Sequence, residues 1–410
     1  MVLNFLWVGF VLLAFAVGLY KLVVLGDVDV FSKMVESTFD MAKTSFDICL
    51  KLAGVMTLWL GIMRVGEKGG AIGALAWVVR PFFSRLFPEV PRDHPVHGTM
   101  ILNFSANLLG LDNAATPVGL EAMRQLQELN PDKTTASNAQ IMFLVLNTSG
   151  LTLIPVAILA YRAQAGAANP TDVFLPILLT TFFSTLAGLI AVAVVQRIRL
   201  FDPVVLAWLV GLGAGVAALI ALFAQMPKER VEVVSTLIAN VTLFSVITAF
   251  VALAAWRRVD VYETFIEGAK EGFAVVIKIL PYLVAMLVAI GVFRASGAMD
   301  YLIGAVRGTA ALFSDDTRFV EALPTGLMKP LSGSGARGLM LEAMHTHGAD
   351  SFIGRLVCTF QGATDTTFYI IAVYFGSVGV RQTRHAVPCG LLADLTAVVA
   401  GILVAYVFFG

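Results

Sequence analysis

Hydrophobic residues in this chain gather in long runs separated by short polar stretches. A helix that crosses a membrane needs about 20 consecutive apolar residues. By that measure we predict nine crossings, at about 2–25, 44–64, 138–163, 171–196, 203–225, 231–256, 272–294, 350–377 and 383–409. The first run lacks a basic beginning and a small-residue cleavage site, so we expect it to be a retained helix and not a signal peptide. The pattern predicts an all-α polytopic membrane protein.

Two further apolar segments, His97–Leu129 and Phe319–His347, are interrupted by polar or glycine-rich residues at 111–116 and Ser332–Gly335. The first arm, His97–Gly110, reaches about 21 Å as a helix, which is short of a hydrocarbon core of about 30 Å. Two short arms around a polar tip are typical of a re-entrant hairpin, whose tip must be covered by protein or face a watery cavity. The alternative is one kinked helix that spans the membrane.

A short amphipathic segment precedes each interrupted segment: 71–87 precedes the first, and 299–313 precedes the second. Both mix aromatic and charged residues, such as Trp77 and Arg80 in the first. Helices of this kind commonly lie along the membrane interface. The alternative is an ordinary loop helix that packs on the protein.

The same order of elements occurs twice, which predicts an internal duplication. Each repeat has a long helix, an amphipathic helix, a hairpin, a crossing broken by polar residues, and a final helix. Ala42, Lys43, Phe46 and Lys51 recur at one offset as Ala269, Lys270, Phe273 and Lys278, and Leu120-Glu121-Ala122-Met123 recurs as Leu341-Glu342-Ala343-Met344. We expect halves of 1–200 and 201–410, with repeats at about 42–198 and 269–409. An odd number of crossing steps separates the repeats, so they are inverted, as in many secondary transporters.

Composition and charge agree with a membrane protein. The chain has 410 residues, of which 58% are hydrophobic and 14% charged, and its formal net charge is zero, which gives no indication of nucleic-acid binding. Lysine and arginine are more frequent on the side of the crossings that carries Met1, so we expect a cytoplasmic N-terminus. The sequence contains no nucleotide loop, nucleophile elbow or zinc-protease motif, so we expect no enzymatic activity.

Polar side chains inside the apolar segments are the candidate functional residues, because polar groups at membrane depth are costly. Their amides and hydroxyls suit a hydroxylated or amide-bearing solute. The predicted substrate-binding residues are Asn103, Asn107, Asp112, Asn113, Thr116, Asn147, Thr148, Ser149, Ser332, Ser334, Arg337, Gln361, Thr364 and Thr366. We expect Asp365 and Thr367 to bind a coupling ion. The alternatives are a structural ion pair of Asp365 with Arg337 or Lys329, and hydroxyls that satisfy their own helix backbone.

Several stretches resemble a known family. Asn103–Pro117 and Asn147–Pro155 resemble spore maturation protein A, and Lys329–Gly338, Gly362–Tyr369 and Val373–Gly376 resemble spore maturation protein B. The chain is thus similar to the two proteins fused and to the nucleoside-recognition Gate superfamily, which includes concentrative nucleoside transporters and the membrane part of the ferrous iron transporter. The resemblance implies paired hairpins and broken helices around a central site in a bacterial inner membrane. The B-type motif has Ser and Glu where this chain has Ala363 and Asp365.

We therefore expect transport of a small polar solute, nucleoside-like or amino-acid-like, coupled to Na⁺ or H⁺ and without another cofactor. The alternatives are a non-transporting scaffold of an envelope or sporulation-related assembly, and passage of a metal ion such as ferrous iron. His94 with His97, and His345 with His347, have metal-ligand spacing but no further ligands nearby in the sequence, so we predict no metal site. The expected partners are the solute, the lipid bilayer and a second copy of the chain, with no nucleic acid.

Overall fold

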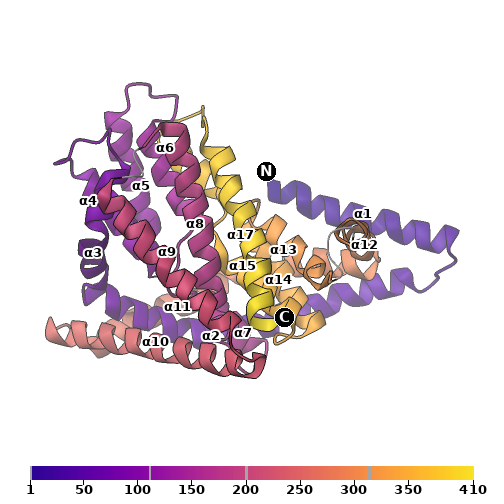
Figure 1. Ribbon diagram of the computed structural model, residues 1–410. Coiled ribbons are helices and arrows are strands. Elements are labelled where there is room, and N and C mark those ends of the chain that lie inside the picture. The colour runs from indigo at the N-terminus through magenta and orange to yellow at the C-terminus, as the bar shows by residue number, and fades with distance from the viewer. Residues whose placement is uncertain (1, 110–111, 199–201, 312–315) are drawn as a thin grey trace. The chain divides into compact units, whose positions relative to one another are not determined.

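The computed structural model describes residues 2–109, 112–198, 202–311 and 316–410, which form helices joined by short loops (Figure 1). The helices are α1 (Val2–Val24), α2 (Val30–Lys68), α3 (Ala71–Leu86), α4 (Val96–Leu108), α5 (Asp112–Leu129), α6 (Asn138–Thr148), α7 (Val156–Gln164), α8 (Phe174–Gln196), α9 (Pro203–Ala224), α10 (Lys228–Trp256), α11 (Val261–Ala295), α12 (Ala298–Ala310), the 3-10 helix η1 (Arg318–Ala322), α13 (Leu323–Met328), α14 (Gly333–His347), α15 (Phe352–Ala363), α16 (Thr367–Ser377) and α17 (Ala386–Phe409). The described ranges contain no β-strand beyond one isolated bridge, so the predicted all-α class is confirmed.

Six helices of the described chain are long and apolar enough to cross a membrane, namely α1, α2, α8, α9, α10 and α17, and they match six predicted crossings. The predicted crossing at 272–294 lies in α11, where Leu283–Ala295 forms an apolar pair with Ala298–Gly308 that is bent by 72°. The remaining two, 138–163 and 350–377, are each divided into two short helices, α6 with α7 and α15 with α16. The chain is a multi-pass membrane protein with the broken helices that its sequence predicts.

The long helices continue well past the predicted crossings. α2 has 39 residues and α11 has 35, whereas the apolar runs predicted only 44–64 and 272–294. The helices extend beyond these crossings because an apolar run marks the part of a helix that suits lipid, while the helix itself continues through polar residues. At 1.5 Å per residue α2 is about 58 Å long, which exceeds a hydrocarbon core of about 30 Å.

The first interrupted segment is a helical hairpin with arms α4 and α5. Thr99 Oγ1 donates to Gln125 Oε1 at 3.0 Å, and Asn103 Nδ2 donates to the Ala115 carbonyl at 2.8 Å. The first bond joins the beginning of α4 to the end of α5, and the second joins the later half of α4 to the first turn of α5. The arms are therefore antiparallel, and the kinked-helix alternative is wrong. Residues 110–111, the end of the predicted first arm and the first residue of the predicted tip, lie outside the described residues.

The hairpin predicts where cysteines will be labelled. A cysteine in place of Lys68, at the end of α2, and one in place of Glu128, at the end of α5, should react with an impermeant maleimide from the same side of the membrane. The reason is that a re-entrant hairpin enters and leaves by one face. Both positions are exposed, whereas the native Cys49, Cys358 and Cys389 are buried. Labelling from opposite sides would show that the segment crosses.

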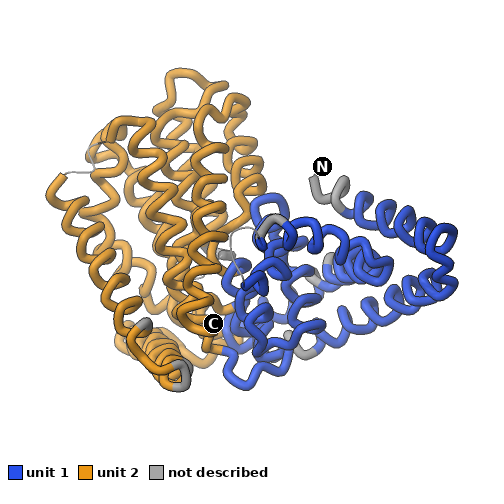
Figure 2. Tube along the Cα trace, turned by 45° about the vertical axis from the view of Figure 1, so that its right-hand side comes forward, with its two compact units in different colours: residues 1–60, 157–170, 269–361 blue, residues 61–156, 171–268, 362–410 orange. Residues whose placement is uncertain are grey.

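The chain divides into two compact units, which Figure 2 colours separately. Unit 1 contains residues 1–60, 157–170 and 269–361, and unit 2 contains residues 61–156, 171–268 and 362–410. Each unit holds the hairpin and first half-helix of one repeat with the second half-helix of the other repeat: α13, α14, α15 and α7 in unit 1, and α4, α5, α6 and α16 in unit 2. The compact units therefore differ from the predicted sequence halves, because the repeats exchange their second half-helices.

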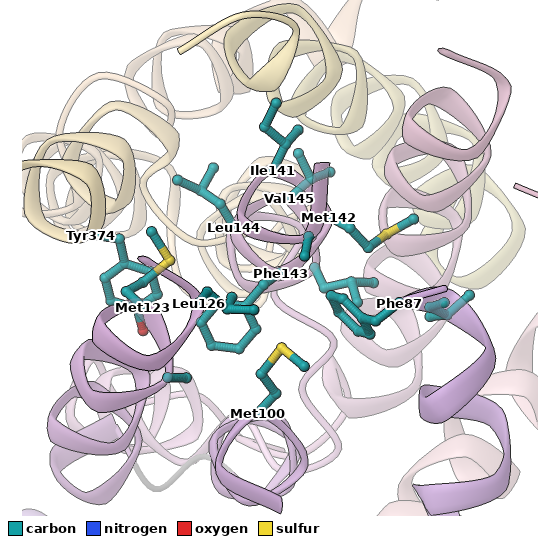
Figure 3. Close-up of a cluster of buried hydrophobic side chains, with 14 of the residues drawn as sticks. Phe87, Met100, Met123, Leu126, Ile141, Met142, Phe143, Leu144, Val145 and Tyr374 are labelled. Atoms are coloured by element: carbon teal, nitrogen blue, oxygen red, sulfur yellow. The ribbon is translucent and has the colours of Figure 1, made fainter. Parts of the chain in front are cut away.

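α6 lies in the core of unit 2 and is surrounded by protein (Figure 3). Its residues Ile141, Met142, Phe143, Leu144 and Val145 are all 0% exposed. A helix that is apolar all round is a buried helix, and the 11 residues of α6 reach only about 16 Å. The core therefore holds the polar C-terminal end of α6 inside the protein.

The ends of α6 follow from local sequence. At its start Ser137 and Gln140 form a capping box, in which each side chain accepts from the other's backbone N–H. Just beyond its end Gly150 has a φ of +57°, a left-handed conformation that ends helices and that glycine adopts without strain. The predicted break is thus set by a glycine at the position where the helix stops.

Candidate functional site

Amide side chains of α4 and α6 form a hydrogen-bonded cluster inside unit 2. Asn147 Oδ1 accepts from Asn107 Nδ2 at 2.7 Å, and Asn147 Nδ2 donates to the Phe143 carbonyl at 2.8 Å. The Tyr374 hydroxyl on α16 donates to Asn147 Oδ1 at 3.4 Å and accepts from Asn103 Nδ2 at 3.5 Å. The last two distances are long for hydrogen bonds, so the Tyr374 hydroxyl is held only loosely. We call Asn103, Asn107, Asn147 and Tyr374 the amide cluster.

Asn103 carries an acceptor that the described protein leaves unused. Its Nδ2 donates to the Ala115 carbonyl, which determines the orientation of the amide because the reversed amide would bring two oxygens together. Its Oδ1 is buried and has no hydrogen-bond partner among the described residues, and the same holds for Ser105 Oγ. A buried polar atom without a partner costs about 1–3 kcal/mol. A bound group with an N–H or O–H would remove that cost at Asn103.

Gly119 on α5 allows the hairpin to approach the amide cluster closely. A Cβ atom at this position would collide with the Tyr374 hydroxyl and lie 2.8 Å from Asn103 Nδ2. Real Cβ atoms essentially never come so close, so any other residue would push the phenol or the amide aside. The spacing of the amide cluster therefore depends on Gly119, although Gly119 has no polar side chain.

The two interrupted helices meet in unit 2. The Asp365 N–H donates to the Thr148 carbonyl at 2.9 Å, and Thr181 on α8 donates to the Gly150 carbonyl at 2.8 Å. The last carbonyls of a helix have no donor within the helix. These two bonds supply donors at the end of α6, so the break is stable inside the protein.

Thr148 and Ser149, both predicted to bind substrate, direct their hydroxyls to their own helix. Thr148 Oγ1 donates to the Val145 carbonyl at 3.0 Å, and Ser149 Oγ donates to the Leu146 carbonyl at 3.2 Å. Both residues are fully buried. This geometry is that of the alternative in which hydroxyls satisfy the backbone, and a role in substrate binding stays a prediction.

The residues predicted to bind a coupling ion lie in different surroundings at the start of α16. Asp365 is exposed, and its carboxylate accepts from the Thr366 N–H at 2.6 Å. A negative charge is favourable there because it lies at the N-terminal end of a helix. Thr367 is buried and donates to Asp394 Oδ2 on α17 at 2.7 Å. Asp394, only 5% exposed, is thus the buried carboxylate here, and Thr364 is buried as well.

Unit 1 has a corresponding arrangement at the second hairpin, in which α13 packs on α14. Ser332 caps α14 by accepting from the Gly335 N–H at 3.0 Å, and its Oγ lies 3.3 Å from that of Ser334. Gln361 Nε2, near the end of α15, donates to the Gly333 carbonyl at 3.3 Å. Its Oε1 is buried without a hydrogen-bond partner in the described part of the chain. In both units an amide near the end of the first half-helix binds the hairpin of its own repeat.

A tyrosine of the other repeat also reaches each hairpin. In unit 1 the Arg337 guanidinium on α14 lies 5.6 Å from the ring centre of Tyr161 on α7, within the range of a cation–π interaction. In unit 2 the corresponding contact is that of Tyr374 on α16 with Asn103 on α4. The predicted residues of both hairpins thus contact the second half-helix of the opposite repeat.

Three predicted residues near the first hairpin tip are less defined. Asp112 and Asn113 begin α5, and their side chains lie outside what the structure describes. Thr116 is exposed. A role for these residues in binding stays a prediction.

Metal ligands do not cluster in the described part of the chain, where no group of three or more histidine, cysteine, aspartate or glutamate residues could hold an ion. Cys358, the cysteine nearest a helix break, is buried with its sulfur 3.4 Å from that of Met344. The expectation of no metal site stays a prediction, because only the described residues bear on it.

Comparison with known proteins identifies the family. The Gate family, described as nucleoside recognition, matches residues 49–165 and 276–381, which together are more than half of the chain. The chain belongs to the Gate family. Each Gate region extends from a long helix to the second half of a broken crossing, from α2 to α7 and from α11 to α16. The two matches fit the predicted repeat.

The chain is also similar to two spore maturation proteins. Spore maturation protein B of Bacillus subtilis is 46% identical over 154 residues, which are 38% of this chain and 85% of the relative. Spore maturation protein A of the same organism is 41% identical over 155 residues, which are 38% of this chain and 79% of the relative. No solved structure matches the chain. The resemblance to both spore maturation proteins is therefore confirmed.

Two residues of this Gate protein, Tyr374 and Asp394, were not among the site residues predicted from the sequence. Tyr374 joins the amide cluster, and the signal for it was its place in the stretch Val373–Gly376 that resembles the family. Asp394 lies in an ordinary apolar crossing, and its only signal is a carboxylate within such a run. Their surroundings come from helices far away in the sequence, so local pattern could not assign them.

Proposed function

We propose that this protein is a non-enzymatic carrier that moves a small polar solute across the bacterial cytoplasmic membrane. The observation that carries the proposal is the buried Asn103 acceptor beside the loosely held Tyr374 hydroxyl, inside a unit built of membrane helices. An N–H or O–H of a solute would supply the donor that Asn103 Oδ1 lacks among the described residues. The family description, nucleoside recognition, supports the same class of solute.

Between the two expected solutes, a nucleoside suits the amide cluster better than an amino acid. The Tyr374 ring stacks on that of Phe143, with centroids 5.9 Å apart and an interplanar angle of 10°. Aromatic rings and amides are the groups that hold a nucleobase by stacking and hydrogen bonding. The ammonium and carboxylate of an amino acid would need charged partners, and the side chains of the amide cluster carry no charge.

We propose Na⁺ or H⁺ as the coupling ion and Asp365 as the group that binds it. Asp365 is exposed, so an ion can reach its carboxylate. Its backbone N–H binds the Thr148 carbonyl, next to Asn147, and this bond would link ion binding to the amide cluster. Thr367 would take part through its hydrogen bond to Asp394, a second carboxylate that can carry a proton.

We also propose a cytoplasmic N-terminus and a homo-oligomer.

A thermal-unfolding screen of the purified protein tests the solute. A nucleoside such as uridine at 100 times its Kd should stabilise the folded state by about 2.7 kcal/mol, while glycine and glutamate should have no effect. Asn103→Ala should remove the shift because it deletes the unused acceptor. Asn138→Ala should keep the shift, because Asn138 begins α6 and donates to Glu89 outside the cluster. A full shift in the Asn103 variant would locate the solute elsewhere.

Uptake into proteoliposomes tests the ion. Asp365→Asn should leave thermal stability unchanged and remove the dependence of uptake on a Na⁺ or proton gradient, because asparagine keeps the shape of the side chain and not its charge. Asp29→Asn, at another exposed carboxylate, should keep that dependence. Unchanged ion dependence in the Asp365 variant would contradict the assignment. A loss of about 3–5 kcal/mol in stability would indicate that Asp365 neutralises a buried cation instead.

A further inference from the structure

A basic cavity of about 1200 Å³ lies in unit 2, apart from the amide cluster. It is lined by residues of α3, the loop from α3 to α4 and the first turns of α4, together with Gln196, Arg197, Ile198 and Asp202. Among the described residues, the charged ones that line it are Arg80, Arg85, Arg92, Arg197, Asp93 and Asp202. Four arginines against two carboxylates give this lining an excess of two positive charges.

Most of this positive charge is not neutralised within the described protein. Arg85 forms an ion pair with Asp202 at 2.7 Å. The side chains of Arg80, Arg92 and Arg197 form no ion pair or hydrogen bond with any residue in the described part of the chain. Guanidinium groups present planar pairs of N–H donors that match the oxygens of a phosphate. The cavity therefore suits a phosphate-bearing ligand.

The cavity lies where membrane-spanning helices end. The apolar span of α8 ends at Gln196, which lines the cavity, and the span of α9 begins at Pro203, directly after the lining residue Asp202. Trp77, which is 78% exposed, and Leu102, which is 41% exposed, also line it. Tryptophan is common at the level of lipid headgroups. A ligand here meets cationic and apolar side chains together, which is the chemistry of a phospholipid and not that of a soluble anion.

We propose that this cavity binds an anionic phospholipid, with its headgroup phosphate at Arg80, Arg92 and Arg197 and an acyl chain along Trp77 and Leu102. Basic pockets at the ends of membrane helices suit such headgroups. α3 packs on α4, the hairpin arm that contributes two residues to the amide cluster. The bound lipid therefore supports the side of the hairpin that faces α3.

Titration of the delipidated full-length protein in detergent tests the proposal. Phosphatidylglycerol should raise the melting temperature, while phosphatidylcholine and glycerol 3-phosphate at the same concentration should not. The triple variant Arg80→Gln, Arg92→Gln, Arg197→Gln should need about a hundredfold more phosphatidylglycerol for the half-maximal shift, since each basic residue contributes about 1 kcal/mol to binding an anionic lipid. Arg124→Gln should bind as the unchanged protein does, because Arg124 pairs with Glu121 outside the cavity.

Single variants keep the test decisive if the triple variant does not fold. Arg80→Gln and Arg197→Gln should each weaken binding of phosphatidylglycerol about fivefold, and Trp77→Ala should weaken it through loss of apolar contact. Equal binding by these variants and the unchanged protein, or equal shifts from both lipids, would overturn the proposal. Binding of glycerol 3-phosphate as tight as that of the lipid would also overturn it, because the site would then be one for a soluble anion.

Discussion

Replacement of Asn147 by leucine is expected to abolish nucleoside binding and to lower the free energy of unfolding by about 2–4 kcal/mol. Leucine has a similar size, so the packing of α6 is kept. Asn107 Nδ2 and the Tyr374 hydroxyl, however, lose the acceptor that they share. A donor left without a partner inside a protein loses its hydrogen bonds to water and gains nothing in exchange. Denaturant unfolding in detergent, combined with a nucleoside titration, measures both effects.

A second substitution separates the lost hydrogen bond from lost packing. The double variant Asn107→Leu, Asn147→Leu should be more stable than Asn147→Leu alone, because removing both partners of a buried hydrogen bond leaves no orphan donor at position 107. Tyr374→Phe keeps the ring that stacks on Phe143 and removes only the hydroxyl, so it should weaken nucleoside binding with little change in stability. Unchanged binding in Asn147→Leu would contradict the proposed role of the amide cluster.

Substitution of Gly150 by alanine is expected to lower the free energy of unfolding by about 2–5 kcal/mol. The positive φ of Gly150 costs an L-residue about 1–2 kcal/mol, and crowding in a packed interior costs about 1–3 kcal/mol more. A Cβ atom there would lie 3.0 Å from the Asp365 nitrogen and 3.2 Å from the Thr364 carbonyl carbon. Both are backbone atoms, so no rotamer change relieves the contact, and the bond from Asp365 to Thr148 would be strained.

Gly379 provides a matched control for this prediction. Its φ is +74°, and a Cβ atom there would meet nothing within 4 Å. Gly379→Ala should therefore show only the backbone cost, about 1–2 kcal/mol. Thermal or denaturant unfolding of the two variants gives the contribution of the contact between the two breaks as a difference. Equal losses in both would show that the breaks do not pack against each other.

The sequence alone determined the membrane class, the duplication and the positions of the breaks. An apolar run of about 20 residues is stable only where its backbone is satisfied by a helix and its side chains by lipid, so the crossings could be predicted by counting. The breaks could also be located from local sequence, because Gly150, with a φ of +57°, follows the end of α6 and a run of polar residues precedes Thr367. Three members of the amide cluster, Asn103, Asn107 and Asn147, were likewise predicted, as amides within apolar segments.

Only the tertiary structure decided which polar residues meet. Tyr374 reaches Asn103 across 271 positions of sequence, because the second half-helix of one repeat packs with the hairpin of the other. No apolar pattern could show this exchange, since the face of a membrane helix that touches lipid is as apolar as the face that touches protein. The apolar pattern also could not show which carboxylate is buried. It predicted Asp365 as the carboxylate inside a crossing, but in the structure Asp365 is exposed and Asp394 is buried.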